Sequence, residues 1–418
     1  MGEMFRAEVT STTNLGSGVV RAPDGRVVFV PGAVCGDDAD IVIVKEHGSY
    51  AEGRVLSLVT MSEHRITPDC EVFFPDGSGC GGCTFRHVSY EHELAVKSEY
   101  IKTVMKKSHI DIEPEPFLTA GCDAVRSKVT VPVDVDGVSG YYAHGSHTVV
   151  PCRRCRLHDG ETDDIRDALT GAGLTGLHHI TVRRASEGTM VILRGCGAGT
   201  ETIRAAAELA ERFPFITSVW AENDGAYTHI SGERAIYDSL AGCRFKISPD
   251  SFYQVNHAGA KLLYRRAIEA AGLRGGERVA DLFCGTGTIG IAAAKSADID
   301  LVGVEINESA VRDACENAEN NGVRARFFCG DAAKYTDDAD CVFLDPPRAG
   351  CPGRLIAHLC RVRPERIVYV SCEPATLARD AAKLAAEGYR IESVTPVDMF
   401  PRTSKVECVA AFTTENQK

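Results

Sequence analysis

The chain has 418 residues, of which 44% are hydrophobic and 25% are charged, and its formal net charge is −12. These values are ordinary for a globular protein, and the length allows two or three domains with large cores. No apolar run approaches the roughly 20 residues that span a membrane, and the N-terminus lacks the apolar stretch of a secretory signal. We therefore expect a cytoplasmic protein with no membrane partner, whose negative charge disfavours extended phosphate binding.

Residues 1–60 consist of short apolar segments separated by turns, such as the segment 27–31 that follows Asp24 and Gly25. Several short strands at this spacing are typical of a small β-barrel of the OB type. This architecture often binds oligonucleotides. The sequence therefore predicts an OB-like β-barrel as the first domain.

Seventeen cysteines are many for a chain whose thiols stay reduced in the cytoplasm. Most are scattered singly, and we expect these to be small buried hydrophobic residues. The exceptions are grouped along the chain, namely Cys70, Cys80, Cys83, Cys152 and Cys155. This grouping indicates a metal site, and the spacing alone leaves zinc and an iron–sulfur cluster open.

Residues 61–244 mix strand and helix patterns, including a helical pattern near residues 90–108. They predict an α+β middle domain, and the helix near 90–108 can pack on the domain that follows. From residue 245 to 418 strand patterns alternate regularly with helical patterns. That alternation predicts a doubly wound α/β sheet, in which ligands bind at the carboxyl ends of the strands.

The first strand of this sheet leads into a glycine-rich loop at residues 285–290, and a helix follows. Such a loop lets the backbone approach a cofactor, which can be NAD, another nucleotide or S-adenosylmethionine. Glu305 ends the next strand, where it can hold ribose hydroxyls or only cap the next helix. Asp331 follows the third strand, in a place to contact an adenine edge. Asp345 opens an Asp-Pro-Pro segment after the fourth strand, which favours a methyltransferase over a dehydrogenase.

Cys372 follows the apolar strand 366–371 and precedes a helix, where a thiol with a lowered pKa can act as a nucleophile. Glu407 is polar within an otherwise apolar final strand, and it either pairs with Lys405 or Arg402 or acts as a base. Burial there would raise the pKa of its carboxyl group, which suits proton abstraction. These two groups fit methylation of uracil, in which a thiolate adds to carbon 6, carbon 5 attacks a methyl group and a base removes the carbon 5 proton.

Five segments carry a family resemblance, namely residues 248–256 (SPDSFYQVN), 281–290 (DLFCGTGTIG), 345–350 (DPPRAG), 371–380 (SCEPATLARD) and 398–407 (DMFPRTSKVE). They resemble the class I RNA 5-methyluridine methyltransferases, over nearly the whole chain. The resemblance implies a Rossmann-like class I methyltransferase domain at 245–418, with Cys372 as nucleophile and Glu407 as base. It also implies S-adenosylmethionine as cofactor, bound by Gln254, Phe283, Thr288, Glu305, Asp331 and Asp345.

Three residues depart from the family's pattern. Thr288 stands where many members have Asn, and Arg402 and Lys405 replace histidines that are frequent near the base. None of these changes touches the minimum requirement of the reaction, but they alter the surroundings of the cofactor and the base.

The N-terminal barrel and the segment from Cys80 to Cys83 resemble the iron–sulfur branch of this family, which bears a TRAM domain and modifies large-subunit ribosomal RNA. This resemblance implies a TRAM-like barrel at 1–60 and a [4Fe–4S] cluster within 61–244. The implied cluster ligands are Cys70, Cys80, Cys83 and Cys155, and Cys152 is the rival for the fourth position. The spacing from Cys70 to Cys80 is longer than usual in the family. We expect a structural cluster that shapes the RNA-binding surface.

The sequence thus predicts a monomeric enzyme that methylates uridine at carbon 5 in structured RNA. The first candidate substrate is 23S ribosomal RNA, and the alternative is the T-loop of a transfer RNA. Three other interpretations stay open. An exocyclic-amine methyltransferase would not need Cys372, and a 5-methylcytidine enzyme would carry a Pro-Cys dipeptide after the Asp, which is absent here. A non-catalytic RNA-binding or folding factor would transfer no methyl group.

Overall fold

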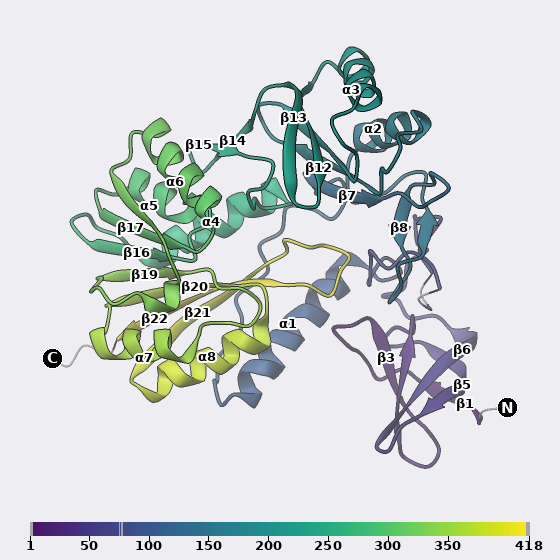
Figure 1. The fold of residues 1–418 in the computed structure, drawn as a ribbon. Helices are drawn as coiled ribbons and strands as arrows, with labels where there is room; N and C mark the ends of the chain where they lie inside the picture. Colours follow the sequence, from purple (N-terminus) through teal and green to yellow (C-terminus); the bar gives the residue numbers. More distant parts are fainter. Residues whose placement is uncertain (1–2, 75, 77, 415–418) are drawn as a thin grey trace. The chain divides into compact units, whose positions relative to one another are not determined.

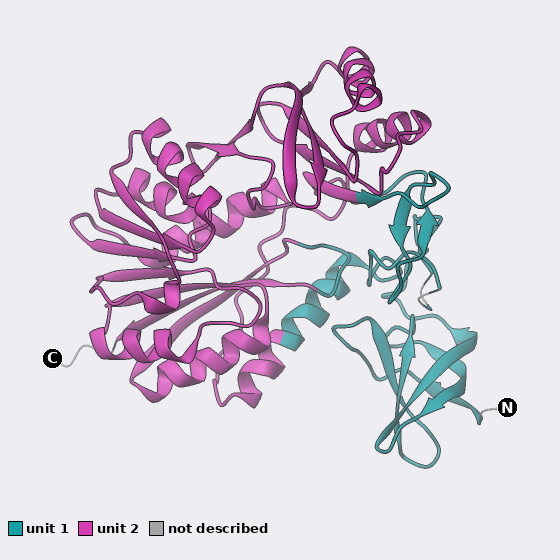
Figure 2. Cartoon of the chain, in the orientation of Figure 1, with its two compact units in different colours: residues 1–100, 131–156, 400–404 teal, residues 101–130, 157–399, 405–418 magenta. Residues whose placement is uncertain are grey.

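The computed structural model describes residues 3–74, 76 and 78–414 (Figure 1). The chain forms two compact units (Figure 2). Unit 1 comprises residues 1–100, 131–156 and 400–404, and unit 2 comprises residues 101–130, 157–399 and 405–418. The division into domains at 1–60, 61–244 and 245–418 stays a prediction. Among the described residues, no helix is both long and apolar enough to cross a membrane.

The N-terminal part of unit 1 is a six-stranded sheet with the order β1-β5-β6-β4-β3-β2. Its strands are β1 (Met4–Glu8), β2 (Ser11–Thr12), β3 (Ser17–Arg21), β4 (Val27–Pro31), β5 (Asp38–Glu46) and β6 (Tyr50–Thr60). Alternate residues such as Val28, Val30 and Ile41 are buried, as expected for a sheet with one face on a core. The sheet curls into a half-barrel, so the predicted OB-like β architecture is confirmed in this form.

Helix α1 (Tyr90–Lys107) lies where the sequence predicts a helix. It begins with acidic residues and ends with Lys106 and Lys107, which complements the helix dipole. From Ile101 onwards its residues belong to unit 2, where Ile101 and Met105 are buried in the core of the large sheet. Unit 1 also contains the two-stranded sheet of β8 (Gly140–Tyr142) and β9 (Val149–Pro151).

The first part of unit 2 is built on a five-stranded sheet with the order β13-β12-β11-β10-β7. The strands and helices of this part are β7 (Lys128–Pro132), α2 (Gly160–Gly171), β10 (His179–Arg184), β11 (Thr189–Arg194), α3 (Thr200–Arg212), β12 (Ile216–Asn223) and β13 (Ala226–Gly232). A hairpin of β14 (Ile236–Leu240) and β15 (Cys243–Ile247) follows. This mixture of strands and helices agrees with the predicted α+β character.

The second part of unit 2 is a seven-stranded sheet with the order β18-β17-β16-β19-β20-β22-β21 (Figure 1). Its strands are β16 (Arg278–Leu282), β17 (Asp300–Glu305), β18 (Ala325–Cys329), β19 (Cys341–Leu344), β20 (Arg366–Ser371), β21 (Tyr389–Val397) and β22 (Glu407–Thr414). Its helices are α4 (His257–Ala271), α5 (Thr288–Ser296), α6 (Glu308–Asn320), α7 (Gly353–Val362) and α8 (Pro374–Ala386), with a 3₁₀ turn at Ala332–Lys334. The predicted doubly wound α/β fold is confirmed.

The direction of the strands determines which side chains meet at one edge of this sheet. Strands β16 to β20 run parallel, and β22 runs antiparallel to both β20 and β21. The carboxyl ends of the parallel strands and the amino end of β22 therefore lie at the same edge. Because ligands bind at this edge in doubly wound sheets, it is the place to look for a site.

Candidate active site

The loop from β16 to α5 combines left-handed backbone with a buried carboxylate. Phe283, Gly285 and Gly287 have φ values of 64°, 54° and 79°. A Cβ atom on Gly287 would lie 2.9 Å from Ile291 Cδ1 and 3.0 Å from Phe327 Cζ, so glycine is required there. Asp281 Oδ2 accepts a hydrogen bond of 2.9 Å from the N–H group of Gly290. The loop is thus held tightly while the first N–H groups of α5 face its open end.

Glu305, the last residue of β17, connects the loop after β16 to the loop after its own strand. Its Oε2 accepts a hydrogen bond of 3.1 Å from the N–H group of Gly285, and its Oε1 accepts one of 2.8 Å from Asn307. The N-cap of α6 is Asn307 itself, whose side chain accepts from Ser309 and Ala310. Glu305 is therefore not the capping residue of α6, and it lies at the edge where a nucleoside would be held.

Asp331 lies after β18, and Thr288 begins α5 after β16. Asp331 caps the 3₁₀ turn, where its Oδ1 accepts from Ala333 at 3.0 Å, and its Oδ2 pairs with Arg354 of α7. Both oxygens of Asp331 thus have protein partners. The Thr288 hydroxyl lies 3.2 Å from the Thr286 hydroxyl at the start of α5.

Gln254, which is buried, and Asp345, which is partly buried, bring two more polar side chains to the same edge. The side chain of Gln254 opposes the rise that burial causes in the pKa of the Tyr264 phenol on α4. Asp345 follows β19, and burial raises the pKa of its carboxyl group to about 7, with the charges of Asp281 and Glu305 acting in the same direction. The carboxyl groups of Asp281, Glu305 and Asp345 therefore influence one another electrostatically.

Cys372 directly follows β20, and Glu407 begins the adjacent strand β22. In the antiparallel pair of β20 and β22, Ser371 is opposite Cys408, and Cys372 and Glu407 are the residues next to this last pair. The charge of Glu407 acts on the thiol of Cys372, which places the two side chains near one another. Glu407 also lies opposite Val397 of β21, and only 6% of its surface is exposed. The structure thus brings together the two residues that the sequence proposed as nucleophile and base.

The electrostatic environment of this pair differs in part from the expectation. Burial raises the pKa of Glu407 well above its ordinary value, and the charge of Asp345 adds to this effect, as predicted for a base. The pKa of Cys372 is also raised, first by burial and then by Glu407 and Asp345, whereas the sequence-based expectation was a lowered value. The expectation was wrong because it considered the strand end and the following helix, and not the two carboxyl groups of other strands.

Arg348 opposes both of these shifts and was not among the predicted site residues. Its positive charge lowers the pKa of Cys372 and that of Glu407. The side chain is exposed on the loop after β19. Arg348 lies in the segment 345–350, which carries the family resemblance, so the sequence did contain a signal for it. Nothing in the sequence of α4 indicated Tyr264.

The predicted cluster ligands belong to unit 1, and each is partly exposed, namely Cys70, Cys80, Cys83 and Cys155. Within the part of the chain that the structure describes, no three or more His, Cys, Asp or Glu side chains are grouped so that they could hold a metal ion. The described residues therefore do not support the expected [4Fe–4S] cluster. The rival ligand Cys152 is buried, and its thiol donates to the carbonyl group of Arg154 at 3.3 Å.

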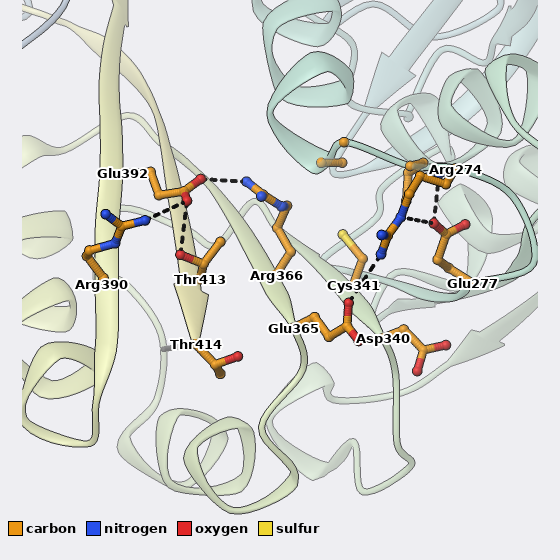
Figure 3. A pocket seen from close by; sticks show the side chains of 13 residues that line it. Arg274, Glu277, Asp340, Cys341, Glu365, Arg366, Arg390, Glu392, Thr413 and Thr414 are labelled. Atoms are coloured by element: carbon orange, nitrogen blue, oxygen red, sulfur yellow. Dashed lines mark hydrogen bonds and ion pairs between the residues drawn. The ribbon is translucent and has the colours of Figure 1, made fainter. Parts of the chain in front are cut away.

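A pocket of about 720 Å³ lies at the opposite edge of the seven-stranded sheet, beside the amino ends of β19 and β20 (Figure 3). Its charged side chains pair with one another. Arg366 and Arg390 bind Glu392 at 2.8 and 3.2 Å, and Arg274 binds Glu365 at 3.4 Å. Because these guanidinium groups already face carboxylates, we assign no function to this pocket.

The seven-stranded sheet, its glycine-rich loop and the acidic residues after its strands define a class I methyltransferase domain that uses S-adenosylmethionine. In agreement, residues 273–405 match a family model described as a methyltransferase domain. A relative named as an uncharacterized RNA methyltransferase from Oceanobacillus iheyensis is 33% identical over 98% of this chain and 96% of its own. A relative of the same description from Staphylococcus aureus is 33% identical over 97% and 96%. The chain belongs to this family of RNA methyltransferases.

A solved structure agrees with this assignment over nearly the whole chain. It is that of a tRNA (uracil-54, C5)-methyltransferase from Pyrococcus abyssi in complex with S-adenosyl-L-homocysteine. The TM-score is 0.79 and the sequence identity 25%, and the match covers 98% of this chain and 100% of the other.

Proposed function

We propose that the protein methylates carbon 5 of a uridine in structured RNA, with Cys372 as the nucleophile and Glu407 as the base. The adjacency of these residues at the ligand-binding edge of the sheet carries the proposal. A nucleophilic thiol and a buried carboxylate beside a cofactor loop are what this reaction requires. The similarity to the Pyrococcus abyssi enzyme, which is named for uracil carbon 5, supports the same chemistry.

Carbon 5 of uracil is a poor nucleophile, and addition of the Cys372 thiolate to carbon 6 converts the ring to an enolate that can react at carbon 5. S-adenosylmethionine supplies the electrophilic methyl group. The residues that would hold it are Gln254, Phe283, Thr288, Glu305, Asp331 and Asp345. The charge of Arg348 favours the thiolate, because it lowers the pKa of Cys372.

After methyl transfer, carbon 5 carries both the methyl group and its original proton. Glu407 takes this proton, the electrons of the carbon–hydrogen bond restore the 5,6 double bond, and the bond to Cys372 breaks to release the thiolate. Burial favours proton uptake by Glu407, since it raises the pKa of that carboxyl group.

The test is formation of 5-methyluridine in RNA that is incubated with the protein and S-adenosylmethionine, measured by nucleoside analysis. Cys372→Ala should abolish the product. Cys351→Ala is the matched control, because Cys351 is 3% exposed and burial raises the pKa of its thiol to about 12, so it should keep activity. An N-methylated nucleoside that Cys372→Ala still produces at the wild-type rate would favour an exocyclic-amine methyltransferase, and the absence of any methyl transfer would favour a non-catalytic RNA-binding factor.

The RNA substrate is the second part of the proposal. We propose 23S ribosomal RNA first, on the resemblance to the iron–sulfur branch. The transfer-RNA T-loop is the alternative, and the name of the Pyrococcus abyssi neighbour favours it. The N-terminal sheet does not distinguish the two RNA substrates, because the match to the Pyrococcus abyssi enzyme, which is named for transfer RNA, also extends over 98% of this chain. Mapping 5-methyluridine in both RNAs with and without the gene distinguishes them.

The remaining proposals rest on the sequence alone. They are a TRAM-type function of the N-terminal half-barrel in RNA binding, a monomeric state and a cytoplasmic location. The [4Fe–4S] cluster also stays a prediction, and the reaction above uses no group of that cluster.

A further inference from the structure

The segment between β15 and α4 carries Gln254 and is neither helix nor strand. The structure describes all of its residues, 248–256, and none of them belongs to a regular element. Gln254 is 8% exposed, and its side chain acts on the pKa of the Tyr264 phenol, as do the charges of Asp345 and Glu407. Gln254 therefore lies among the groups of the candidate active site. Since no ladder of strand hydrogen bonds fixes this segment, its conformation depends on the individual contacts that hold it.

Arg183 of β10 binds the first half of this segment. Its guanidinium group donates to the carbonyl groups of Ser248 at 2.7 Å, of Pro249 at 3.4 Å and of Ser251. The carbonyl group of Ser248 also accepts from the N–H group and the hydroxyl group of Ser251, at 3.2 and 3.0 Å. The carbonyl groups of one turn thus converge on one planar side chain, whose donors have fixed directions and hold the turn in one arrangement. All of these residues belong to unit 2.

The burial of Arg183 shows that it contributes geometry more than stability. Arg183 is 3% exposed, and the carbonyl groups that it binds are neutral. Burial lowers the pKa of its guanidinium group from 12.5 to about 10, although the charges of Asp250 and Asp313 oppose this effect. The group is still charged at neutral pH, and a buried charge costs the folded state more than an apolar side chain of similar volume does. What an apolar side chain does not provide is the set of donors that holds the turn.

A second contact holds the far end of the segment. The N–H group of Ser127 donates to the carbonyl group of Val255 at 2.7 Å, and the carbonyl group of Ser127 accepts from the N–H group of Arg184 at 2.7 Å. The hydroxyl group of Ser127 lies 3.5 Å from the carbonyl oxygen of Gln254, which is long for a hydrogen bond. On this side the backbone near Gln254 is thus held by one short hydrogen bond, and on the other side it is held by the turn on Arg183.

We propose that Arg183 is a positioning residue for the cofactor: by holding the turn at residues 248–251 it determines where the side chain of Gln254 meets S-adenosylmethionine. This inference rests on the proposed function, because Gln254 is a proposed cofactor-binding residue. Gln254 follows Ser251 by three positions, so a turn that loses its contacts with Arg183 is displaced together with Gln254. Hydrogen bonds keep their strength only over a range of about 0.5 Å in length, so a small displacement of Gln254 weakens its contact with the cofactor.

The experiment measures the affinity of the full-length protein for S-adenosyl-L-homocysteine by isothermal titration calorimetry, well below the unfolding temperature. Arg183→Met keeps an unbranched aliphatic chain and removes the donors, whereas Arg183→Lys keeps the charge and a smaller set of donors. We expect Arg183→Met to weaken binding about 10-fold, as for the loss of one good hydrogen bond, and Arg183→Lys to weaken it less. Gln254→Ala should weaken binding at least as much as Arg183→Met does.

A double variant separates positioning from a general loss of stability. If Arg183 acts through Gln254, the protein with both Arg183→Met and Gln254→Ala should bind no more weakly than Gln254→Ala alone, because the contact that Arg183 positions is already absent. Arg166→Ala is the control for the loss of a buried arginine. Arg166 binds Asp163 at 2.8 Å on α2, so this variant should be less stable but should keep the wild-type affinity.

The outcomes distinguish the inference from the proposed function. If Gln254→Ala binds S-adenosyl-L-homocysteine as the wild type does, the cofactor role of Gln254 is wrong, and the inference is wrong with it. If Gln254→Ala weakens binding but Arg183→Met does not, or if the two effects multiply in the double variant, only the inference is wrong and Arg183 is a structural residue. If Arg183→Met is insoluble, the same criteria apply to Arg183→Lys, alone and combined with Gln254→Ala.

Discussion

Replacement of Asp281 by Asn should change the pH dependence of stability in a defined direction. Asp281 is 1% exposed, and burial raises the pKa of its carboxyl group from 3.8 to about 7, although the hydrogen bond from Gly290 lowers it. Since each pKa unit corresponds to ~1.4 kcal/mol, ionised Asp281 costs the folded state about 4 kcal/mol above pH 7. The pKa of Asp281 is higher in the folded than in the unfolded protein. The contribution of this carboxyl group to stability is therefore complete below about pH 3.8 and is lost as the pH rises toward 7.

Asn keeps an oxygen that can accept from Gly290 but carries no charge. One oxygen of Asp281, Oδ1, has no hydrogen-bond partner among the described residues, so the amide group of Asn would be unpaired there at a cost of about 1–3 kcal/mol. The variant should therefore be no more stable than the wild type at pH 5 and more stable at pH 8. Between pH 5 and pH 7 the difference in unfolding free energy between the variant and the wild type should change by about 3 kcal/mol, which is the value of proton linkage over two pH units.

Thermal unfolding of both proteins between pH 5 and pH 8 measures this, and the difference in melting temperature should move by roughly 3–5 °C. Asp238→Asn is the control whose effect should not depend on pH between 5 and 8, because a carboxyl group with a pKa lowered from 3.8 titrates below this range. Asp238 is equally buried, but hydrogen bonds from His257 and Ser186 hold its pKa below the ordinary value although burial opposes them. A difference for Asp281→Asn that does not depend on pH would refute the reasoning about the buried carboxyl groups.

Three further predictions concern the reaction, the metal and the substrate. Glu407→Gln should still form the methylated adduct with ordinary RNA, and turnover should fall by roughly 10²–10⁴ as for lost general bases; normal turnover would assign the base to another group, with Asp345 as the first candidate. Protein purified without oxygen should be brown and contain about four irons per chain if the cluster exists. Colourless protein with one zinc, or with no metal, would overturn that prediction, and loss of colour in Cys80→Ala or Cys83→Ala would identify ligands. Deletion of the gene should remove 5-methyluridine from 23S ribosomal RNA, and loss from transfer RNA alone would establish the alternative.

The fold of the catalytic part could be predicted because its signals are local. The glycine-rich loop after β16 and the alternation of apolar strands with helices depend on short stretches of sequence, and the structure has the strands where they were expected. The proximity of Cys372 and Glu407 was also accessible, since it follows from motif order once the final strand is antiparallel.

Other features depend on residues that are distant in the sequence. The raised pKa of Cys372 arises from carboxyl groups on two other strands, and the helix that follows the cysteine gave no sign of them. The contacts of Arg402 join a loop near the end of the chain to Glu93 on α1, which no local pattern contains. The N-terminal strands were expected from their turns, but the pattern of the turns does not determine whether the sheet closes or stays a half-barrel.

The most direct test of the central claim is covalent capture of the RNA by Cys372. When the target uridine carries fluorine at carbon 5, thiolate attack and methyl transfer can proceed, but fluorine does not leave as a cation and elimination stops. A denaturing gel should then show a shifted protein–RNA band that requires S-adenosylmethionine, is present in Cys351→Ala and is absent in Cys372→Ala. A band that persists in Cys372→Ala, or the lack of a band from wild-type protein that methylates the unmodified RNA, would contradict nucleophilic catalysis by Cys372.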